Sequence, residues 1–180
     1  MELEERRRTS EQVYSGRLLK VYRDTVELPN GRLSDREYIK HPGAVVIIPL
    51  LPDDRLMLIR QYRYPMGKIL IELPAGKLDP GESKLDTARR ELEEETGYRS
   101  ESFTELAEIH PCIGYSDEKM WLYLATDLIQ SRQQTDQDEF IELLPVAVPD
   151  ALKMVWSGQI TDVKTIIGIL WCQRYLETQS

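Results

Sequence analysis

The spacing of the apolar residues along this chain of 180 residues first changes close to residue 83, and this change limits the folds that the chain can adopt. Before that point, short apolar or alternating runs are separated by Gly and Pro, a pattern typical of β-strands. Strands are expected at residues 18–28, 32–40, 44–51, 55–61 and 69–73. Asn30-Gly31 predicts a hairpin between the first two strands, and Pro52-Asp53-Asp54 predicts a second hairpin between the third and fourth.

Helical spacing follows a Gly- and Pro-rich stretch, residues 75–82, that is expected to be a loop. Residues 83–96 place apolar side chains on one helical face, Ser83 and Asp86 form a capping box, and Gly97 suits the left-handed position beyond the last turn. Further strands are expected at 103–109, 120–126 and 142–146, and helices at 150–156 and 162–176 with Thr161 as the N-cap. Strands on both sides of one helix, with more helices at the end, predict a sheet covered by helices.

The charge of the chain argues against nucleic acid as a partner, because 23 Lys and Arg stand against 31 Asp and Glu, a net charge of −8. Residues 1–75 carry 13 basic and 11 acidic side chains, 76–98 carry 4 and 7, and 99–180 carry 6 and 13. No apolar run approaches the roughly 18 residues of a membrane span, and no signal peptide is recognised, so a cytoplasmic location without membrane contact is expected. The run Arg6–Arg8 is interpreted as a solvated terminal segment, and Cys112 and Cys172 as reduced thiols.

Three glutamates at Glu91, Glu94 and Glu95 fall at i, i+3 and i+4 of the expected helix and therefore share one face. Like charges at this spacing repel one another, and their place near the carboxyl end of the helix also opposes its dipole. A divalent cation resolves this conflict, since Mg²⁺ prefers hard oxygen ligands. The alternative interpretation is an acidic face that is simply solvated.

From residue 76 to residue 98 the chain resembles the sequence signature of the Nudix hydrolases. The fixed positions of that signature are filled by Gly76, Glu82, Arg90-Glu91-Leu92, Glu94-Glu95 and Gly97-Tyr98. The resemblance implies the Nudix fold, an α+β fold of the α/β/α sandwich type with a mixed β-sheet between helices, here with an amino-terminal antiparallel β-hairpin or sheet. Two domains are expected: residues 1–42, a β subdomain for dimerisation and substrate reading, and residues 43–180, the Nudix hydrolase domain.

The resemblance also implies hydrolysis of a nucleoside diphosphate linked to another moiety, with Mg²⁺, or alternatively Mn²⁺, as cofactor. It makes Glu91 and Glu95 direct metal ligands and the backbone carbonyl of Ala75 another ligand. Glu94 becomes a further or water-mediated ligand and a candidate catalytic carboxylate.

Two more residues of the signature receive a supporting role from the resemblance. Arg90 is implied to be an orienting ion-pair residue, and Glu82 its partner or an outer metal ligand. A purely structural salt bridge is the alternative for both residues.

Motifs outside the signature resemble the ADP-ribose pyrophosphatases, a subfamily of the Nudix hydrolases. These motifs are His41-Pro42-Gly43-Ala44-Val45, Gln61-Tyr62-Arg63-Tyr64-Pro65 and Ile71-Glu72-Leu73-Pro74-Ala75-Gly76. By this resemblance Arg63 contacts the diphosphate, where a guanidinium suits two oxygens. Arg36 and Glu37 match the region that reads adenine, often across a homodimer with swapped amino-terminal sheets. The alternatives are a surface cation at Arg63 and a solvent-facing strand pair at Arg36 and Glu37.

The loop at residues 110–118 lies where the subfamily carries a mobile catalytic loop with a glutamate near its end. Glu118 occupies that place and is expected to position or activate the attacking water, an exposed loop acid being the alternative. Many ADP-ribose enzymes have Ser-Pro-Gly in this loop, whereas this chain has Cys112-Ile113-Gly114.

The leading hypothesis is therefore Mg²⁺-dependent hydrolysis of ADP-ribose to AMP and ribose 5-phosphate by a homodimer. One alternative is a hydrolase of another nucleotide sugar, such as GDP-mannose. The other is a non-catalytic sensor that binds ADP-ribose.

Overall fold

The structure is a computed structural model that describes residues 2–135 and 139–179. The chain forms two compact units. The amino-terminal unit consists of residues 1–43 and 110–119, and the main unit of residues 44–109 and 120–180.

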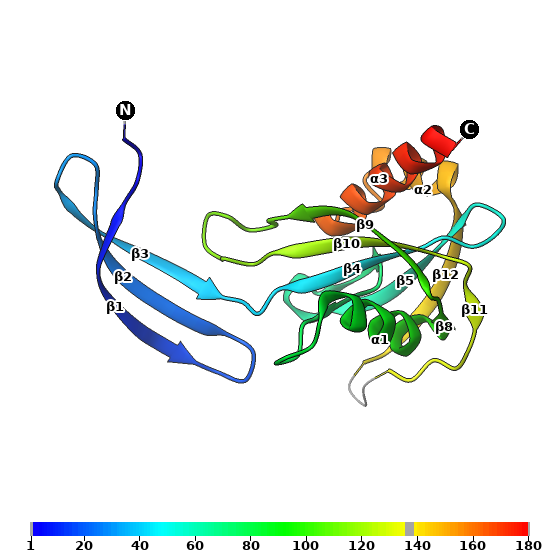
Figure 1. Cartoon of the computed structure of the whole chain (residues 1–180), viewed down its shortest axis with the longest axis horizontal. Helices are drawn as coiled ribbons and strands as arrows, with labels where there is room; N and C mark the ends of the chain where they lie inside the picture. The colour runs from blue at the N-terminus through cyan, green and yellow to red at the C-terminus, as the bar shows by residue number, and fades with distance from the viewer. Residues whose placement is uncertain (1, 136–138, 180) are drawn as a thin grey trace. The chain divides into compact units, whose positions relative to one another are not determined.

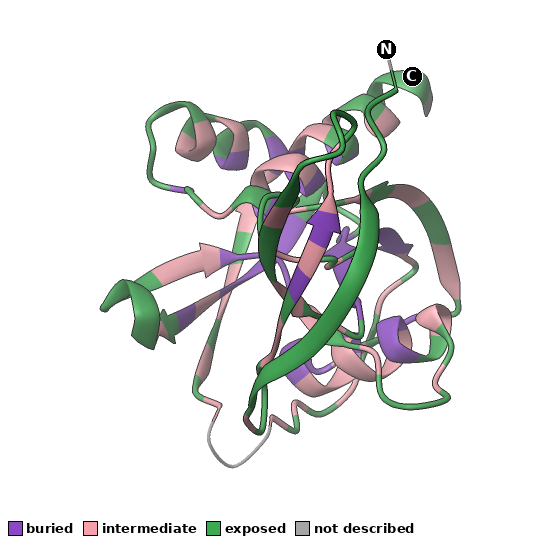
Figure 2. Ribbon diagram, turned by 90° about the vertical axis from the view of Figure 1, so that its left-hand side faces the viewer, coloured by how far each residue is buried: buried purple, intermediate pink, exposed green. Residues whose placement is uncertain are grey.

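The amino-terminal unit is built on a three-stranded antiparallel sheet of β1 (Arg6–Ser15), β2 (Lys20–Glu27) and β3 (Leu33–Lys40), in that order. The hairpin predicted at Asn30-Gly31 is confirmed, and Gly31 adopts the positive φ of 77° that such a turn requires. The sequence does not predict β1. Its side chains are exposed along the whole strand (Figure 2), so they have no alternating apolar pattern to reveal a strand.

Residues 110–119 belong to the amino-terminal unit because they bond to the end of β3. The amide of Ile39 donates to the carbonyl of Tyr115 at 2.8 Å, and the amide of Asp117 donates back to Ile39 at 3.2 Å. The carboxylate of Asp117 accepts the amide of His41 at 2.8 Å. The expected catalytic loop is therefore anchored on the amino-terminal sheet.

The main unit contains a four-stranded mixed sheet in the order β7-β4-β10-β9, in which only β4 and β10 are parallel. A three-stranded antiparallel sheet, β12-β5-β6, and the short pair β11-β8 complete it. The strands are β4 (Ala44–Pro49), β5 (Arg55–Arg63), β6 (Lys68–Glu72), β7 (Ala75–Lys77), β8 (Tyr98–Arg99), β9 (Ser102–Ile109), β10 (Met120–Thr126), β11 (Ile129–Gln130) and β12 (Ile141–Ala147); a short 3₁₀ turn, Tyr64–Met66, follows β5.

The second predicted hairpin is wrong, because β4 and β5 lie in different sheets. Only the pairing next to the turn forms, with a bridge between Leu50 and Leu56 and a bond from the Leu51 amide to the Arg55 carbonyl at 2.8 Å. All six residues of β4 are buried. β4 lies inside the sheet, between β7 and β10, and other elements pack on both of its faces, so every side chain of the strand is buried.

Helices cover both faces of the four-stranded sheet (Figure 1), which confirms the α+β, helix–sheet–helix prediction. Helix α1 (Lys84–Thr96) packs on one face, and α2 (Val148–Trp156) and α3 (Val163–Gln179) pack on the other. Alternate residues of β4 point to opposite faces. Thus Val45 and Ile47 meet α1, whereas the next residues along the strand, Val46 and Ile48, belong to the core that includes α2 and α3.

Two smaller predictions have clear outcomes. The N-cap of α3 is Asp162 rather than Thr161, because the carboxylate of Asp162 accepts the amide of Thr165 at 3.1 Å. Cys112 and Cys172 are free, as expected. In the part of the chain that the structure describes, no helix is long and apolar enough to cross a membrane.

Gly168 lets α3 approach the sheet closely. A Cβ atom at this position would lie 2.3 Å from Cδ1 of the fully buried Leu73 and 3.3 Å from Cγ1 of Ile48. We expect Gly168→Val to lower the free energy of unfolding by about 1–3 kcal/mol, since overpacking forces the core to shift. Urea unfolding followed by circular dichroism measures this, with Arg174→Val, exposed on the same helix, as the control. An equal loss in both variants would assign the effect to helix propensity instead.

Candidate active site

The loop and helix that carry the candidate ligands are fixed at both ends by the residues that the sequence singles out. The hydroxyl of Ser83 accepts the amide of Asp86 at 3.2 Å, and the amide of Gly97, at φ 69°, donates to the carbonyl of Glu93 at 2.8 Å. Both predicted caps of α1 are therefore confirmed. The preceding loop differs from the prediction, since its first three residues form β7 and pair with β4.

Gly76 allows the carboxylate of Glu91 to lie against the backbone of β7. A Cβ atom on residue 76 would come within 1.7 Å of Oε1 and 1.9 Å of Cδ of Glu91. Any side chain at this position would displace the carboxylate. The glycine of the signature is therefore a steric requirement of Glu91.

Glu95 lies beside Ala75, whose amide donates to Oε2 of Glu95 at 3.1 Å. The side chain is almost fully buried, and this burial, together with the charges of Glu91 and Glu139, raises the pKa of Glu95 to about 8. Burial also raises the pKa of Glu91. The predicted ligands Ala75, Glu91 and Glu95 thus come together where negative charge is poorly solvated, an environment that a cation would stabilise.

Arg90 lies at the centre of the acidic cluster. Its Nε and Nη2 atoms donate to the two carboxylate oxygens of Glu82, each at 3.0 Å. Its Nη1 donates to Glu91 at 2.7 Å and to Glu94 at 3.0 Å. Arg90 therefore pairs with Glu82 and also bonds two of the candidate ligands, Glu91 and Glu94.

The described residues contain no group of three or more His, Cys, Asp or Glu side chains that converge as a ready metal site. The carboxylates of Glu91 and Glu94 are instead paired with the guanidinium of Arg90. The donor set nevertheless fits a hard divalent cation. It offers carboxylate and carbonyl oxygens, Gly76 leaves space for the approach of Glu91, and the buried Glu95 lacks a full counter-charge.

The Glu82–Arg90 pair gives a prediction for stability against pH. Hydrogen bonding to Arg90, which outweighs the effect of burial, lowers the pKa of Glu82 to about 2. Because the unfolded-state pKa is about 4.3, the pair stabilises the fold fully above that pH, and this contribution is lost as the pH falls toward 2. We expect Glu82→Gln to lower the free energy of unfolding by about 1–2 kcal/mol at pH 7 and much less at pH 2.5. Urea unfolding with EDTA at both pH values measures it; an equal loss at both would contradict this assignment.

Arg63 makes a bidentate pair with the buried Glu72, from Nε at 2.7 Å and from Nη2 at 2.8 Å. Glu72 above all, and Glu95 more weakly, raise the pKa of Arg63, so its charge is within electrostatic reach of the acidic cluster. Glu72 also pairs with Lys164, a buried lysine at the start of α3. Neither Glu72 nor Lys164 was predicted as a site residue, although Glu72 lies in the motif Ile71-Glu72-Leu73.

The other predicted residues, Arg36, Glu37 and Glu118, lie in the amino-terminal unit. Arg36 of β3 donates from Nε to the carboxylate of Glu5 at 2.9 Å, whereas Glu37 is exposed. Glu118 lies 3.6 Å from Nδ1 of His41, measured from its Oε1. The structure therefore brings Glu118 together with the end of β3 inside this unit.

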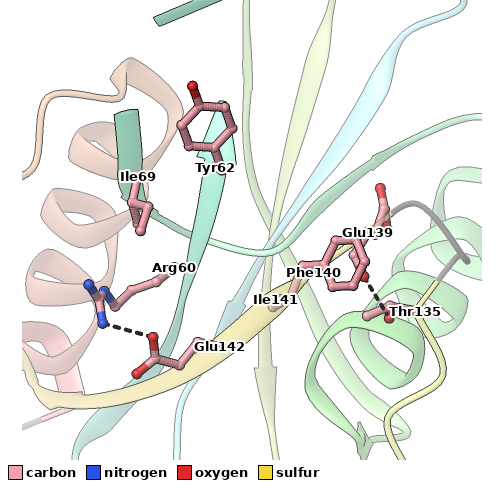
Figure 3. A pocket seen from close by; sticks show the side chains of 8 residues that line it. All are labelled: Arg60, Tyr62, Ile69, Thr135, Glu139, Phe140, Ile141 and Glu142. Atoms are coloured by element: carbon pink, nitrogen blue, oxygen red, sulfur yellow. Dashed lines mark hydrogen bonds and ion pairs between the residues drawn. The ribbon is translucent and has the colours of Figure 1, made fainter. Parts of the chain in front are cut away.

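A hollow of about 460 Å³ opens in the main unit between β5, β6 and the segment that leads into β12. Figure 3 shows Tyr62 and Ile69 on one side and Phe140 on the other, with a 2.7 Å salt bridge between Arg60 and Glu142. The remaining lining residues are Thr135, Glu139 and Ile141. Glu139 also acts electrostatically on Glu91 and Glu95, so the hollow adjoins the acidic cluster. No sequence pattern indicated it.

Comparison with known proteins decides the family. Residues 40–161 match the model of the NUDIX domain. The chain belongs to the Nudix hydrolase family. Residues 5–39 of this Nudix hydrolase match a second model, the nucleoside diphosphate sugar hydrolase N-terminal domain.

Several relatives of this Nudix hydrolase match it over nearly their whole length. It is 40% identical to the ADP-ribose pyrophosphatase of Bacillus subtilis (strain 168), over 95% of this chain and 94% of that protein. It is 41% identical to the methanol dehydrogenase activator of Bacillus methanolicus, over 94% and 93%. The crystal structure of an ADP compounds hydrolase superposes with a TM-score of 0.90 at 25% identity, covering 100% of this chain and 98% of that one. Members of this family use divalent metal ions, which agrees with the donor set at Glu91 and Glu95.

Proposed function

We propose that this enzyme hydrolyses the diphosphate of ADP-ribose to AMP and ribose 5-phosphate with Mg²⁺. The observation that carries the proposal is the place of Glu91 against Gly76, next to the buried Glu95 and the Ala75 amide. The likeness to an ADP-ribose pyrophosphatase along almost the entire chain supports the choice of substrate. The match of residues 5–39 to a domain of nucleoside diphosphate sugar hydrolases supports the wider substrate class.

Mg²⁺, or Mn²⁺ in its place, would be held by the carboxylates of Glu91 and Glu95 and the carbonyl of Ala75, with Glu94 as a further or water-mediated ligand. Bound there, the ion supplies charge neutralisation on the diphosphate and a lower pKa for a coordinated water. Arg90, which already bonds Glu91 and Glu94, would orient these carboxylates.

Protein side chains would supply the proton acceptor for the attacking water and the binding group for the diphosphate. Water adds to one phosphorus, the bond from that phosphorus to the bridging oxygen breaks, and two phosphate monoesters result. We propose that the carboxylate of Glu118 accepts a proton from the attacking water, with Glu94 as the second candidate. The exposed edge of the Arg63 guanidinium binds the diphosphate, since Glu72 occupies the opposite edge.

We assign dimerisation and substrate reading to the amino-terminal subdomain, residues 1–42, with Arg36 and Glu37 toward adenine, and the chemistry to residues 43–180. The amino-terminal unit supports a homodimer because it exposes large apolar side chains. These are Val13, Tyr14, Leu18, Leu19 and Leu33. A cytoplasmic location is part of the same proposal.

A substrate panel tests this function. We expect kcat/KM for ADP-ribose to exceed that for GDP-mannose at least about tenfold with Mg²⁺. Preference for GDP-mannose would show that the proposed substrate is wrong, although the protein would still be a nucleotide-sugar hydrolase. Binding of ADP-ribose without turnover of any nucleotide sugar, with Mg²⁺ or Mn²⁺, would favour the non-catalytic sensor.

A further inference from the structure

Lys164 is a buried lysine, only 6% exposed, in the first turn of α3. Its Nζ donates to the carboxylate of Asp162 at 2.8 Å and pairs with the carboxylate of Glu72, which is itself only 2% exposed. Burying an ammonium group is costly, and well-packed apolar residues often give equal or greater stability in such places. The burial of Lys164 therefore calls for a role beyond filling the core.

Glu72 links Lys164 to Arg63. Its Oε1 accepts Nε of Arg63 at 2.7 Å, and its Oε2 accepts Nη2 at 2.8 Å as well as the ammonium of Lys164. This side-on pairing uses one edge of the guanidinium and directs the edge that carries Nη1 away from Glu72. The side chain of Arg63 remains 40% exposed, so that second edge has room to meet a ligand.

The same turn of α3 also holds the backbone that leads to Ala75. The amide of Leu73 donates to the hydroxyl of Thr165 at 2.8 Å, and that hydroxyl donates to Asp162 at 2.5 Å. Two residues after Leu73, the amide of Ala75 donates to Glu95. The segment from Glu72 to Ala75 is thus tied to α3 at one end and to α1 at the other.

The negative charge of Glu72 explains why a second cation, the ammonium of Lys164, lies beside it. With Arg63 alone, Glu72 would cancel most of the positive field that a diphosphate needs, because the two groups form a closed bidentate pair. Lys164 shares the charge of Glu72 and also fixes the direction of its carboxylate. Both effects favour Arg63 as a binding group for anionic oxygens.

We propose that Lys164 is a positioning residue for the substrate diphosphate, acting through Glu72 on Arg63. The proposal rests on the function proposed above, in which Arg63 meets the diphosphate. It concerns the diphosphate alone, so it holds for any nucleotide sugar that the enzyme takes.

A double-mutant cycle between Lys164 and Arg63 tests this role. The readouts are kcat, KM and the calorimetric affinity for the α,β-methylene analogue of ADP-ribose, which cannot be hydrolysed. We expect Lys164→Met to weaken analogue binding and raise KM about tenfold, with kcat changed less than about threefold. In the Arg63→Gln background the same substitution should change affinity less than about twofold. Lys153→Met, an exposed lysine on α2, is the matched control and should have no effect in either background.

If Lys164→Met weakened binding of the analogue equally in both backgrounds, the proposal would be overturned, because Lys164 would then act only through a structural ion pair. If Lys164→Met does not fold, Asp162→Asn replaces it, since Asn retains the N-cap of α3 but loosens the ammonium. A smaller rise in KM, about threefold and again absent with Arg63→Gln, is then expected, and a rise that persists overturns the proposal. Turnover by the wild-type enzyme separates the role of Lys164 from the choice of ADP-ribose as substrate. If ADP-ribose is not cleaved but another nucleotide sugar is, the cycle is run with the methylene analogue of that substrate.

Discussion

Replacing Glu95 by Gln is expected to lower kcat for ADP-ribose about a thousandfold. The substitution keeps the shape of the side chain and an oxygen for the Ala75 amide, but removes the charge of a proposed metal ligand. Stabilisation by a bound metal is worth several kcal/mol, and each 1.36 kcal/mol is a factor of ten, so about 4 kcal/mol gives this loss. Steady-state kinetics with saturating Mg²⁺ measures it.

Glu93→Gln is the matched control, because Glu93 lies on the same helix but bonds Arg99 and Ser131 instead of the acidic cluster. We expect it to retain nearly full kcat. Glu95→Gln should also retain binding of the α,β-methylene analogue within about tenfold, since Arg63, the proposed diphosphate ligand, is unchanged. Similar activity of the two variants would remove Glu95 from the proposed metal site.

Gly76→Ala is expected to lower kcat about a hundredfold although it adds a single methyl group. That methyl would lie 1.7 Å from the Glu91 carboxylate, so either the carboxylate or β7 must move by an ångström or more. A displacement of this size in a reacting site costs about 10²-fold in rate. Steady-state kinetics measures this loss.

Lys77→Ala, on the same strand with an exposed side chain, is the control for the loss of activity and should leave kcat nearly unchanged. Isothermal titration with Mn²⁺ separates displacement of a ligand from general damage. We expect Gly76→Ala to weaken Mn²⁺ binding at least about tenfold. Wild-type Mn²⁺ affinity together with low kcat would show that the clash harms the enzyme without moving Glu91 from the metal.

The sequence predicts most elements of the fold because their apolar patterns are local. Helix α1 is the clearest case, with Ser83 and Gly97 at its ends as expected. Pairing between strands is less predictable. The short turn after β4 suggested a hairpin, but two buried faces draw β4 into a sheet with β10, which begins more than seventy residues later. The strand β1 is not predicted, because all its side chains are exposed and no apolar pattern marks a buried face.

The residues of the candidate site also differ in how far the sequence predicts them. Glu91, Glu94 and Glu95 are visible from sequence because helical spacing alone places them on one face. Glu72 and Lys164 are 92 residues apart, and only the packing of α3 against the end of β6 brings their charges together. The steric reason for Gly76 also requires the position of a side chain on another element.

The most direct test of the account is the identity of the products from ADP-ribose in ¹⁸O-labelled water. The purified full chain with Mg²⁺ is predicted to give AMP and ribose 5-phosphate in equal amounts, with one ¹⁸O in a phosphate of one product, and to give neither with EDTA. Unchanged ADP-ribose, or ADP and free ribose from cleavage outside the diphosphate, would contradict it.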